Sequence, residues 1–261
     1  SAGSEKGSEE NVIPTATNLV TVNGTGYATL EAAIAAATPV NGVITYEING
    51  KVEVTDTGWV QVAKAGLTEL TKVEFVGKTG DAEICITNAT SVLADQEYDI
   101  DVSFKGLTLS HPGGEWVSDL GHATNYFACV LRNTSAAENT VTYTGCTFPN
   151  GACNNQYGKT VFDNCNFTNS TSGKYNLWNY GGNTEIKNSS FAGTRGVKTY
   201  NEGTLAVAPT VKIENTSFNG LTEKAAIVAS KATDITLTGV SATGCGKGLL
   251  TRDISGNDEL T

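Results

Sequence analysis

Short stretches between about residue 100 and residue 250 alternate apolar and polar residues with a period of two. Six of them align on one shared residue: VSFKGLTL, VTYTGCTF, TVFDNCNF, TEIKNSSF, VKIENTSF and ITLTGVSA. Two residues before the shared residue stands an apolar side chain in every copy, and the residues on either side of it are mostly polar. This alternation predicts a strand with one buried face.

The shared residue, which we call the pivot, is Gly or Asn in every copy: Gly106, Gly145, Asn164, Asn188, Asn215 and Gly239. Before the pivot the apolar residues lie an even number of positions away from it along the sequence, and after the pivot they lie an odd number of positions away. In a continuous strand this change would place the two halves on opposite faces. A bend at the pivot restores a common interior, and a left-handed backbone conformation makes such a bend. Because Gly and Asn tolerate that conformation best, we predict it at all six pivots.

The segments between copies predict a third strand in each repeat. They are ACNNQYG, YNLWNYGG, VKTYNEG and AAIVASKA, and successive pivots lie 39, 19, 24, 27 and 24 residues apart. Three short strands in such a period predict one rung of a parallel β-helix, with rungs about 4.8 Å apart. Hexapeptide repeats of the left-handed type are absent, and parallel crossovers are usually right-handed, so we expect a right-handed coil.

The segment NGTGYATLEAAIAAA predicts a helix before the first rung. Apolar residues at positions 30, 33, 34 and 37 recur with helical spacing, Thr29 is suited to be the N-cap, and Pro39 ends the pattern. Such a helix would cover the open end of the coil and prevent edge pairing. The segments GVITYEINGKVEV, KVEFVG and AEICITN predict the earlier rungs.

These features together resemble the pectin-lyase-like family of right-handed parallel β-helix proteins, most closely its noncatalytic, adhesin-like modules of bacterial surface proteins. The resemblance rests on the single Asn or Gly bend and on aligned Asn and Phe positions over roughly 100–250, extended by the N-terminal helix. The predicted fold class is therefore all-β, a single coil with three short strands per rung, roughly 8–9 rungs and a capping helix near 29–37.

We expect one domain over 11–255, preceded by a flexible linker at 1–10 and followed by a truncated linker at 256–261. The polar opening SAGSEKGSEE and the lack of any Met favour a piece excised from a longer chain.

Charge narrows the classes of partner. The formal net charge is −10, whereas nucleic acid and anionic membranes both select for clustered Lys and Arg. We therefore expect no nucleic-acid partner. No apolar run approaches the roughly 20 residues that span a bilayer, so we also expect no membrane insertion.

The six Cys residues show no CxxC or Cys/His spacing, which argues against a zinc site. Most lie in apolar surroundings, which favours buried thiols, with one or two disulfides as the alternative. Cys146 and Cys165 each follow a pivot in adjacent rungs. Their parallel side-chain directions do not suit a disulfide torsion, so we predict two reduced thiols in contact.

Many members of the family that this chain resembles cleave acidic polysaccharides, along the outer face of strands that correspond to the third strands here. A glycoside hydrolase needs two carboxylates about 5–9.5 Å apart, and these segments offer only Glu202. Asp119 and His122, in the insertion HPGGEWVSDLGHATN, are further acid or base candidates. We expect no catalytic site; an enzyme would have to use Glu202, His122 and Asp119.

One acidic stretch, ADQEYDIDVSF, places four carboxylates at alternate positions, namely Asp95, Glu97, Asp99 and Asp101. In an extended strand they would share one outer face and could bind calcium. No Gly-containing ligand loop follows, so a solvated charged edge is the favoured interpretation. We therefore expect no metal or cofactor, and Asp99 and Asp101 are the candidates if a metal is bound.

The segments expected to form the third strands also contain aromatic residues that would line up in a row across neighbouring rungs. If the Leu of YNLWNYGG points inward, then Asn176, Trp178 and Tyr180 point outward, and Tyr157 and Tyr200 occupy similar places in the neighbouring rungs. Flat aromatic rings with amides between them stack on sugars or anchor a protein partner. In the alternative interpretation, Trp178 or Tyr180 is covered by turn loops or packed inside.

We therefore expect a noncatalytic, adhesin-like binding module of a secreted or surface-attached bacterial protein. It would contact a glycan or a host surface protein through its outer face and the 111–125 insertion, as a monomeric module within a larger chain. One alternative is a polysaccharide lyase or glycoside hydrolase with an atypical site. The other is a structural stalk without a preferred ligand.

Overall fold

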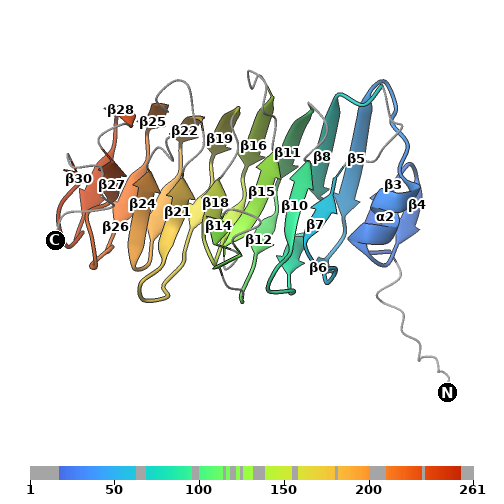
Figure 1. The fold of residues 1–261 in the computed structure, drawn as a ribbon, viewed down its shortest axis with the longest axis horizontal. Coiled ribbons are helices and arrows are strands. Elements are labelled where there is room, and N and C mark those ends of the chain that lie inside the picture. Colours follow the sequence, from blue (N-terminus) through green and yellow to red (C-terminus); the bar gives the residue numbers. More distant parts are fainter. Residues whose placement is uncertain are drawn as a thin grey trace, which may run out of the picture.

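A computed structural model describes residues 18–62, 69–95, 100–113, 116–117, 122–123, 126–131, 139–154, 158–179, 182–199, 210–230 and 233–253. Over these ranges the chain winds into an elongated coil, with α2, β3 and β4 at one end and β28, β29 and β30 at the other (Figure 1). Each turn adds one strand to each of three parallel sheets. The predicted parallel β-helix is confirmed.

The first and second sheets consist of the strands on either side of each pivot. The first sheet contains β5 (Val43–Ile48), β8 (Lys72–Gly77), β11 (Asp101–Lys105), β16 (Thr140–Thr144), β19 (Lys159–Asp163), β22 (Asn183–Lys187), β25 (Thr210–Glu214) and β28 (Asp234–Thr238). The second sheet contains β6 (Lys51–Val54), β9 (Glu83–Ile86), β12 (Thr108–Ser110), β17 (Thr147–Phe148), β20 (Asn166–Phe167), β23 (Ser190–Ala192), β26 (Ser217–Asn219) and β29 (Ser241–Thr243).

The third sheet is built from the segments between the repeats. It contains β7 (Trp59–Gln61), β10 (Val92–Asp95), β15 (Phe127–Leu131), β18 (Ala152–Asn154), β21 (Tyr175–Asn179), β24 (Arg195–Thr199), β27 (Ile227–Ser230) and β30 (Leu250–Asp253). Outside the coil pattern, β3 (Val20–Val22) runs antiparallel to both β4 (Thr25–Tyr27) and β5, and β13 (Trp116–Val117) pairs antiparallel with β14 (His122–Ala123).

The pivots have the predicted left-handed backbone. Their φ angles are 64° at Gly106, 62° at Gly145, 55° at Asn164, 53° at Asn188, 47° at Asn215 and 63° at Gly239. Each pivot lies between a strand of the first sheet and a strand of the second sheet. The bend therefore turns the apolar positions of both strands toward one interior.

The interior is filled by side chains that stack on their counterparts in the next rung. In the second sheet Phe148, Phe167, Phe191 and Phe218 form a continuous stack, with ring centroids 4.8, 4.3 and 4.7 Å apart. A second stack in the first sheet contains Tyr46, Phe75, Phe104, Tyr143 and Phe162. Offset stacking adds to the apolar area that each ring already buries. The aligned Phe positions of the repeat are thus explained by packing.

A polar ladder lies at the corner between the third and first sheets. Asn154 Nδ2 donates to Asn179 Oδ1 at 2.7 Å, and Asn179 Nδ2 donates to Thr199 Oγ1 at 3.1 Å. The hydroxyls of Thr160 and Thr184 donate to Asn154 and Asn179. All five side chains are buried. Burial of polar groups costs little when each finds a partner, so this ladder keeps successive rungs in register.

The predicted helix forms as α2 (Leu30–Ala36). Thr29 is its N-cap, and the Oγ1 atom of Thr29 accepts a hydrogen bond from the Ala32 N–H at 3.1 Å. Leu30, Ala33 and Ile34 are buried against the first turns of the coil. The helix is one residue shorter than predicted at each end because Thr29 and Ala37 are its caps.

The six cysteines are free thiols, as predicted for Cys146 and Cys165. Both of these side chains are buried; the Cys146 Sγ donates to the Phe104 carbonyl at 3.6 Å and the Cys165 Sγ to the Tyr143 carbonyl at 3.5 Å. The Cys165 thiol donates a hydrogen bond to the Cys146 sulfur, and this bond, together with burial, raises the pKa of Cys165 well above its usual range, whereas it lowers the pKa of Cys146. Both thiols are buried, so the pair fills the interior of the coil as small apolar side chains do.

Candidate functional site

The outer face of the third sheet carries a column of residues that are in register from rung to rung. Ala128, Cys153, Trp178, Lys198 and Val228 are successive partners in this column. Their neighbour Leu177 belongs to the apolar core, so the column points outward. Trp178 is half-buried, whereas the other four side chains are buried. Trp178 thus points outward, but this face is not an open platform, and the role of Trp178 in ligand binding stays a prediction.

Trp178 belongs to an aromatic–cation cluster, which we define as Tyr126, Tyr175, Trp178, Arg195 and Lys198. The Tyr126 and Tyr175 ring centroids lie 6.2 and 5.9 Å from that of Trp178, and the Tyr175 ring meets it edge-on. The Lys198 Nζ lies 4.6 Å from the Trp178 centroid, and the Arg195 Cζ lies 5.1 Å from the Tyr175 centroid. Cations over aromatic faces are attracted by the ring quadrupole, which holds Trp178 in one orientation.

Tyr126 connects this cluster to an earlier rung. Its hydroxyl oxygen accepts a hydrogen bond from the Tyr175 backbone N–H at 3.1 Å, and burial raises its pKa to about 12. Gly151, with φ of 77°, makes room for this ring: a Cβ there would lie 3.1 Å from a Tyr126 ring carbon and 2.8 Å from the Tyr175 carbonyl oxygen. A side chain at position 151 would therefore clash with the backbone carbonyls of Tyr175 and Asn176 and crowd the Tyr126 ring.

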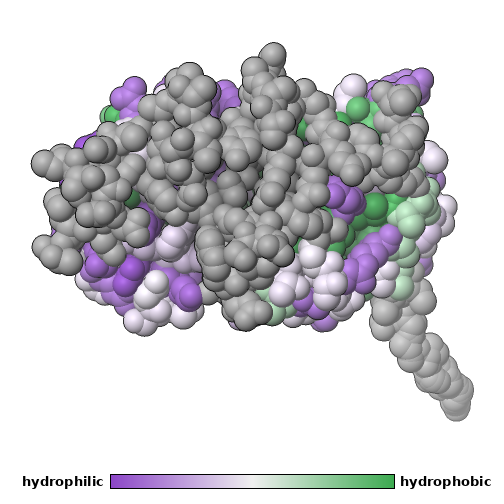
Figure 2. Space-filling view, in the orientation of Figure 1, coloured by the Kyte–Doolittle hydropathy of each residue, from purple (hydrophilic) through white to green (hydrophobic). Residues whose placement is uncertain are grey.

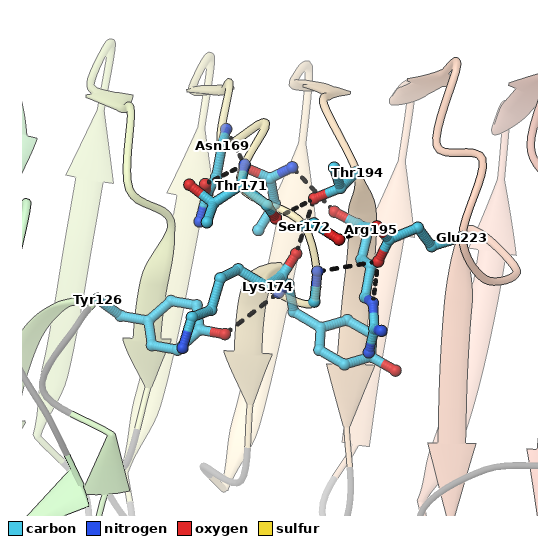
Figure 3. Close-up of polar contacts among 11 residues, drawn as sticks. Tyr126, Asn169, Thr171, Ser172, Lys174, Thr194, Arg195 and Glu223 are labelled. Carbon is cyan, nitrogen blue, oxygen red and sulfur yellow. Dashed lines mark hydrogen bonds and ion pairs between the residues drawn. The ribbon is translucent and has the colours of Figure 1, made fainter.

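An ion pair fixes the other side of the cluster (Figure 3). The Arg195 Nε lies 2.7 Å from the Glu223 Oε1, and Glu223 also accepts from the Gly173 N–H at 3.0 Å and the Ser172 hydroxyl at 2.9 Å. Arg195, with the Gly173 and Ser172 donors, holds the pKa of Glu223 below its usual range. Burial disfavours the charged form of Arg195, but Glu223 and Tyr175 outweigh it and raise the Arg195 pKa. Through its bonds to Arg195, Ser172 and Gly173, Glu223 therefore links the corners of three successive rungs.

The structure corrects the prediction for Asn176, which was expected on the exposed face. Its side chain is fully buried. The Oδ1 atom accepts from the Asn169 N–H at 2.8 Å, while Nδ2 donates to the carbonyls of Ala192 and Arg195 at 3.0 and 2.9 Å. Residue alternation fails here, at the start of β21, because the amide bonds to the backbone of the adjoining corner. The amide instead satisfies three backbone groups at this corner.

Most other predicted site residues lie outside the described ranges: Tyr157, Tyr180, Tyr200, Glu202, Asp119 and Asp99. His122 lies in β14, where it pairs with Val117. The predicted aromatic ladder and the acid and base candidates therefore stay predictions.

The predicted carboxylate face is wrong in one respect. Asp95 ends β10 in the third sheet, whereas Asp101 begins β11 in the first sheet, so the two do not share a strand. Asp101 is exposed, and its Oδ1 accepts from the Thr140 N–H at 2.7 Å. In the described part of the chain, no three His, Cys, Asp or Glu side chains gather as a metal site would require.

Sequence reasoning missed Tyr126, Tyr175, Arg195 and Glu223. Simple alternation places Tyr175 on the inner face with Leu177. A usable signal was nevertheless present, because aligning KYNLWN with TRGVKT on Leu177 and Val197 sets Trp178 beside Lys198 and Tyr175 beside Arg195. No sequence signal points to Glu223, which reaches Arg195 from the following rung.

A separate cavity of about 410 Å³ lies at the capped end, lined by Thr21, Asn23, Gly24, Val40, Val43, Thr45 and Glu47. Green, apolar residues gather on the described surface at this end (Figure 2). The polar side chains of the cavity are bonded within the protein: Asn23 to the Thr38 backbone and Thr45 to Glu74. The cavity is therefore a hollow in the surface between β5 and the β3–β4 turn, and the polar groups named are already bonded within the protein.

Within the described ranges, no helix is both long and apolar enough to cross a membrane. Comparison of the chain with models of known protein families, with curated proteins and with solved structures finds no match. The resemblance to the pectin-lyase-like family therefore stays a prediction from the sequence repeat.

Proposed function

We propose that the protein is a noncatalytic glycan-binding module of a secreted or surface-attached bacterial protein, and that it contacts its ligand at Trp178 on the outer face of the third sheet. The observation that carries this proposal is the fixed, half-buried indole of Trp178, held by Tyr126, Tyr175 and Lys198. The bacterial, extracellular setting rests on the family resemblance.

A fixed aromatic ring is well suited to sugar recognition. An indole offers a large contact area with few rotatable bonds, so little side-chain entropy is lost on binding. The cluster also stands beside polar groups, since Thr171 and Ser172 are exposed in the corner that leads into β21. Hydroxyl groups at the rim of an aromatic contact supply the hydrogen bonds that orient a sugar.

The charges of the third sheet support binding rather than hydrolysis. On this sheet the charged residues nearest to Trp178 are the cations Arg195 and Lys198, whereas Asp95 and Asp253 end β10 and β30, each three strands away from β21. Glycoside hydrolysis depends on a pair of carboxylates that flank the scissile bond. In the part of the chain that the structure describes, the carboxylate in contact with the cluster is Glu223, which Arg195 holds in its charged form.

The proposal is tested by screening the intact chain against plant, mucin and host glycans, with binding and product release recorded together. For the ligand found, we expect Trp178→Ala to weaken binding roughly 30-fold, about 2 kcal/mol, and Trp178→Phe to weaken it less. Tyr27→Ala, which removes a partly exposed ring at the capped end, is the control and should leave affinity unchanged.

Two results would overturn the proposal. Release of reducing ends or unsaturated products, lost in Glu202→Gln or His122→Ala, would establish the polysaccharide-cleaving alternative. Absence of binding to every glycan, with the fold intact by circular dichroism, would leave the structural stalk.

A further inference from the structure

His111 follows β12 and is almost completely buried, at 1% exposure. Both of its ring nitrogens face backbone carbonyl oxygens: Nδ1 lies 3.1 Å from the Tyr126 oxygen, and Nε2 lies 3.1 Å from the Asn88 oxygen. A neutral imidazole carries one N–H, whereas a carbonyl oxygen can only accept. The neutral ring therefore bonds to one of these carbonyls, and an imidazolium bonds to both.

Other rungs indicate which nitrogen of His111 carries the proton in the neutral ring. At the corner between the second and third sheets, Asn88 and Asn169 each donate through Nδ2 to a carbonyl of the preceding rung, at 3.3 and 2.9 Å. The Nε2 atom of His111 stands in the same relation to the Asn88 carbonyl. The neutral ring thus keeps its proton on Nε2, and the lone pair of Nδ1 faces the Tyr126 carbonyl.

Tyr126 connects His111 to the aromatic–cation cluster. Its carbonyl faces the imidazole, its hydroxyl accepts from the Tyr175 N–H at 3.1 Å (Figure 3), and its ring centroid lies 6.2 Å from that of Trp178. In a close-packed interior a shift of the Tyr126 backbone is passed on to its buried ring, because no empty space takes it up. The position of the indole therefore depends on how firmly the Tyr126 carbonyl is held.

A chain of amides anchors His111 on its backbone side. The His111 N–H donates to Asn150 Oδ1 at 2.9 Å, and the Asn150 carbonyl accepts from Asn169 Nδ2 at 2.9 Å. The Asn169 N–H in turn donates to Asn176 Oδ1 in β21 at 2.8 Å. Because the backbone of His111 is tied in this way, a change in its ring acts on Tyr126.

The surroundings of His111 offer no carboxylate to its ring. The described elements around it carry these titratable side chains: Glu83, Cys85, Tyr126, Cys129 and Cys153. The charged one, Glu83, accepts a hydrogen bond from the Ser110 hydroxyl. Burial lowers the pKa of His111 and outweighs the two carbonyls, which raise it. His111 is therefore neutral at neutral pH and takes up a proton below its ordinary value of about 6.5.

We propose that His111 is a positioning residue for Trp178 and acts as a proton-operated latch. A proton taken up from solvent by Nδ1 converts the imidazole to an imidazolium, which donates to the Tyr126 carbonyl while Nε2 keeps its bond to Asn88. The added bond holds Tyr126, and with it the Trp178 indole, more firmly in acid than at neutral pH. The consequence for glycan affinity rests on the proposed function, whereas the latch itself does not.

Nitrogen-15 spectra of the histidine side chains in the intact 261-residue chain test the first step. With the second histidine assigned through His122→Asn, we expect His111 to show an Nε2–H and a bare Nδ1 at neutral pH. As the pH falls, Nδ1 should gain a proton with a midpoint below about 6.5. A ring that stays neutral down to about pH 4, or one whose neutral form carries its proton on Nδ1, would overturn the proposal.

Amide hydrogen exchange of Tyr175 tests the second step, because its N–H donates to the Tyr126 hydroxyl. Protonation of His111 should slow this exchange roughly fivefold beyond the intrinsic pH dependence, the equivalent of about 1 kcal/mol for one added hydrogen bond. His111→Asn is the matched variant, since Asn makes the corner bond at Asn88 and Asn169 but does not titrate. The pH-dependent step should vanish in this variant.

Circular dichroism at each pH verifies the fold. Faster exchange of the Tyr175 N–H on protonation would contradict the latch, as would the same pH dependence in His111→Asn or unfolding of the parent before its imidazole titrates. If His111→Asn does not fold, the spectra and the exchange of the parent decide the question by themselves.

The latch and the proposed function can fail separately. For a glycan ligand, affinity should rise up to about fivefold as the pH falls through the His111 midpoint, and this rise should be absent in His111→Asn. A titrating latch without any glycan binding would refute the proposed function alone. Binding that is lost in Trp178→Ala but does not change with pH would refute the latch alone.

Discussion

The two ends of the coil are built on the same rung but finish in different ways. At the first rung, α2 places Leu30, Ala33 and Ile34 over the interior, and the side chains beneath it are buried. At the last rung, Leu237 and Leu250 are partly exposed although they continue the repeat. A repeating unit therefore buries its apolar positions only where another layer covers it.

The comparison also separates two kinds of sequence information. The cap is specified by local sequence signals that differ from those of the repeat: the N-cap Thr29, helix-forming alanines and an apolar stripe with helical spacing. The last described rung, in contrast, follows the repeat pattern through to its last strand. A helical segment of the first kind covers the end of a coil, whereas a rung of the repeat leaves strand edges to which further β-structure can be added.

The largest expected contrast comes from matched leucines at the two ends. Leu30→Ala should lower the free energy of unfolding by about 3 kcal/mol, because it opens a cavity under a fully buried side chain. Leu250→Ala should cost less than about 1 kcal/mol, because that side chain is already 40% exposed. Urea unfolding at low protein concentration measures both. Equal losses would contradict the picture of one covered and one open end.

The cap itself is tested at Thr29, whose hydroxyl oxygen accepts from the Ala32 N–H. Thr29→Ala should cost about 1 kcal/mol, and Thr29→Ser should restore most of it. Thermal unfolding followed by circular dichroism provides the measurement. Unchanged stability in Thr29→Ala would mean that tertiary packing alone holds α2 in place.

The open end should gain stability when its stack is extended. Ala242→Phe would place a ring on Phe218, which now ends the stack of Phe148, Phe167 and Phe191. We expect a gain of roughly 0.5–1 kcal/mol in the free energy of unfolding, typical of an added aromatic pair. Ala242→Leu is the control for apolar area without stacking. A loss of stability would show that the end cannot accommodate another layer.

The smallest effect is expected at Glu223, in the corner that precedes β27 near the open end. Its pKa is lowered in the folded protein, so its contribution is present above the unfolded value of about 4.3 and is lost as pH falls through the folded value. Glu223→Gln should therefore be slightly less stable than the parent at pH 7. The two stabilities, measured by urea unfolding, should converge below about pH 4.3, and a constant difference would refute the assignment.

Much of the fold could be predicted because each local signal repeats. Six pivots with Gly or Asn, each flanked by the same apolar positions, indicate the same bend six times, and every one has positive φ. The helix was predicted to within one residue at each end, because its N-cap and apolar spacing are local features.

The site could be predicted only in part. Alternation correctly turned Trp178 outward, but it failed for Asn176, where the chain rounds a corner and the amide bonds to backbone groups. Alternation also treated ADQEYDIDVSF as one strand, although Asp95 and Asp101 belong to different sheets. Corners obey backbone hydrogen bonding rather than a period of two, so residues near them escape pattern analysis.

The sequence by itself determined the rung: its three strands, its left-handed pivot and the helix that closes one end. These follow from residue-level preferences that act over a few neighbours. The sequence also indicated that consecutive rungs stack, but only the tertiary structure decided which side chains near the corners meet across them. Lys198 lies over Trp178 and Glu223 reaches Arg195 across rungs because stacking sets their register, and the last rung is open because nothing in the described chain stacks on it.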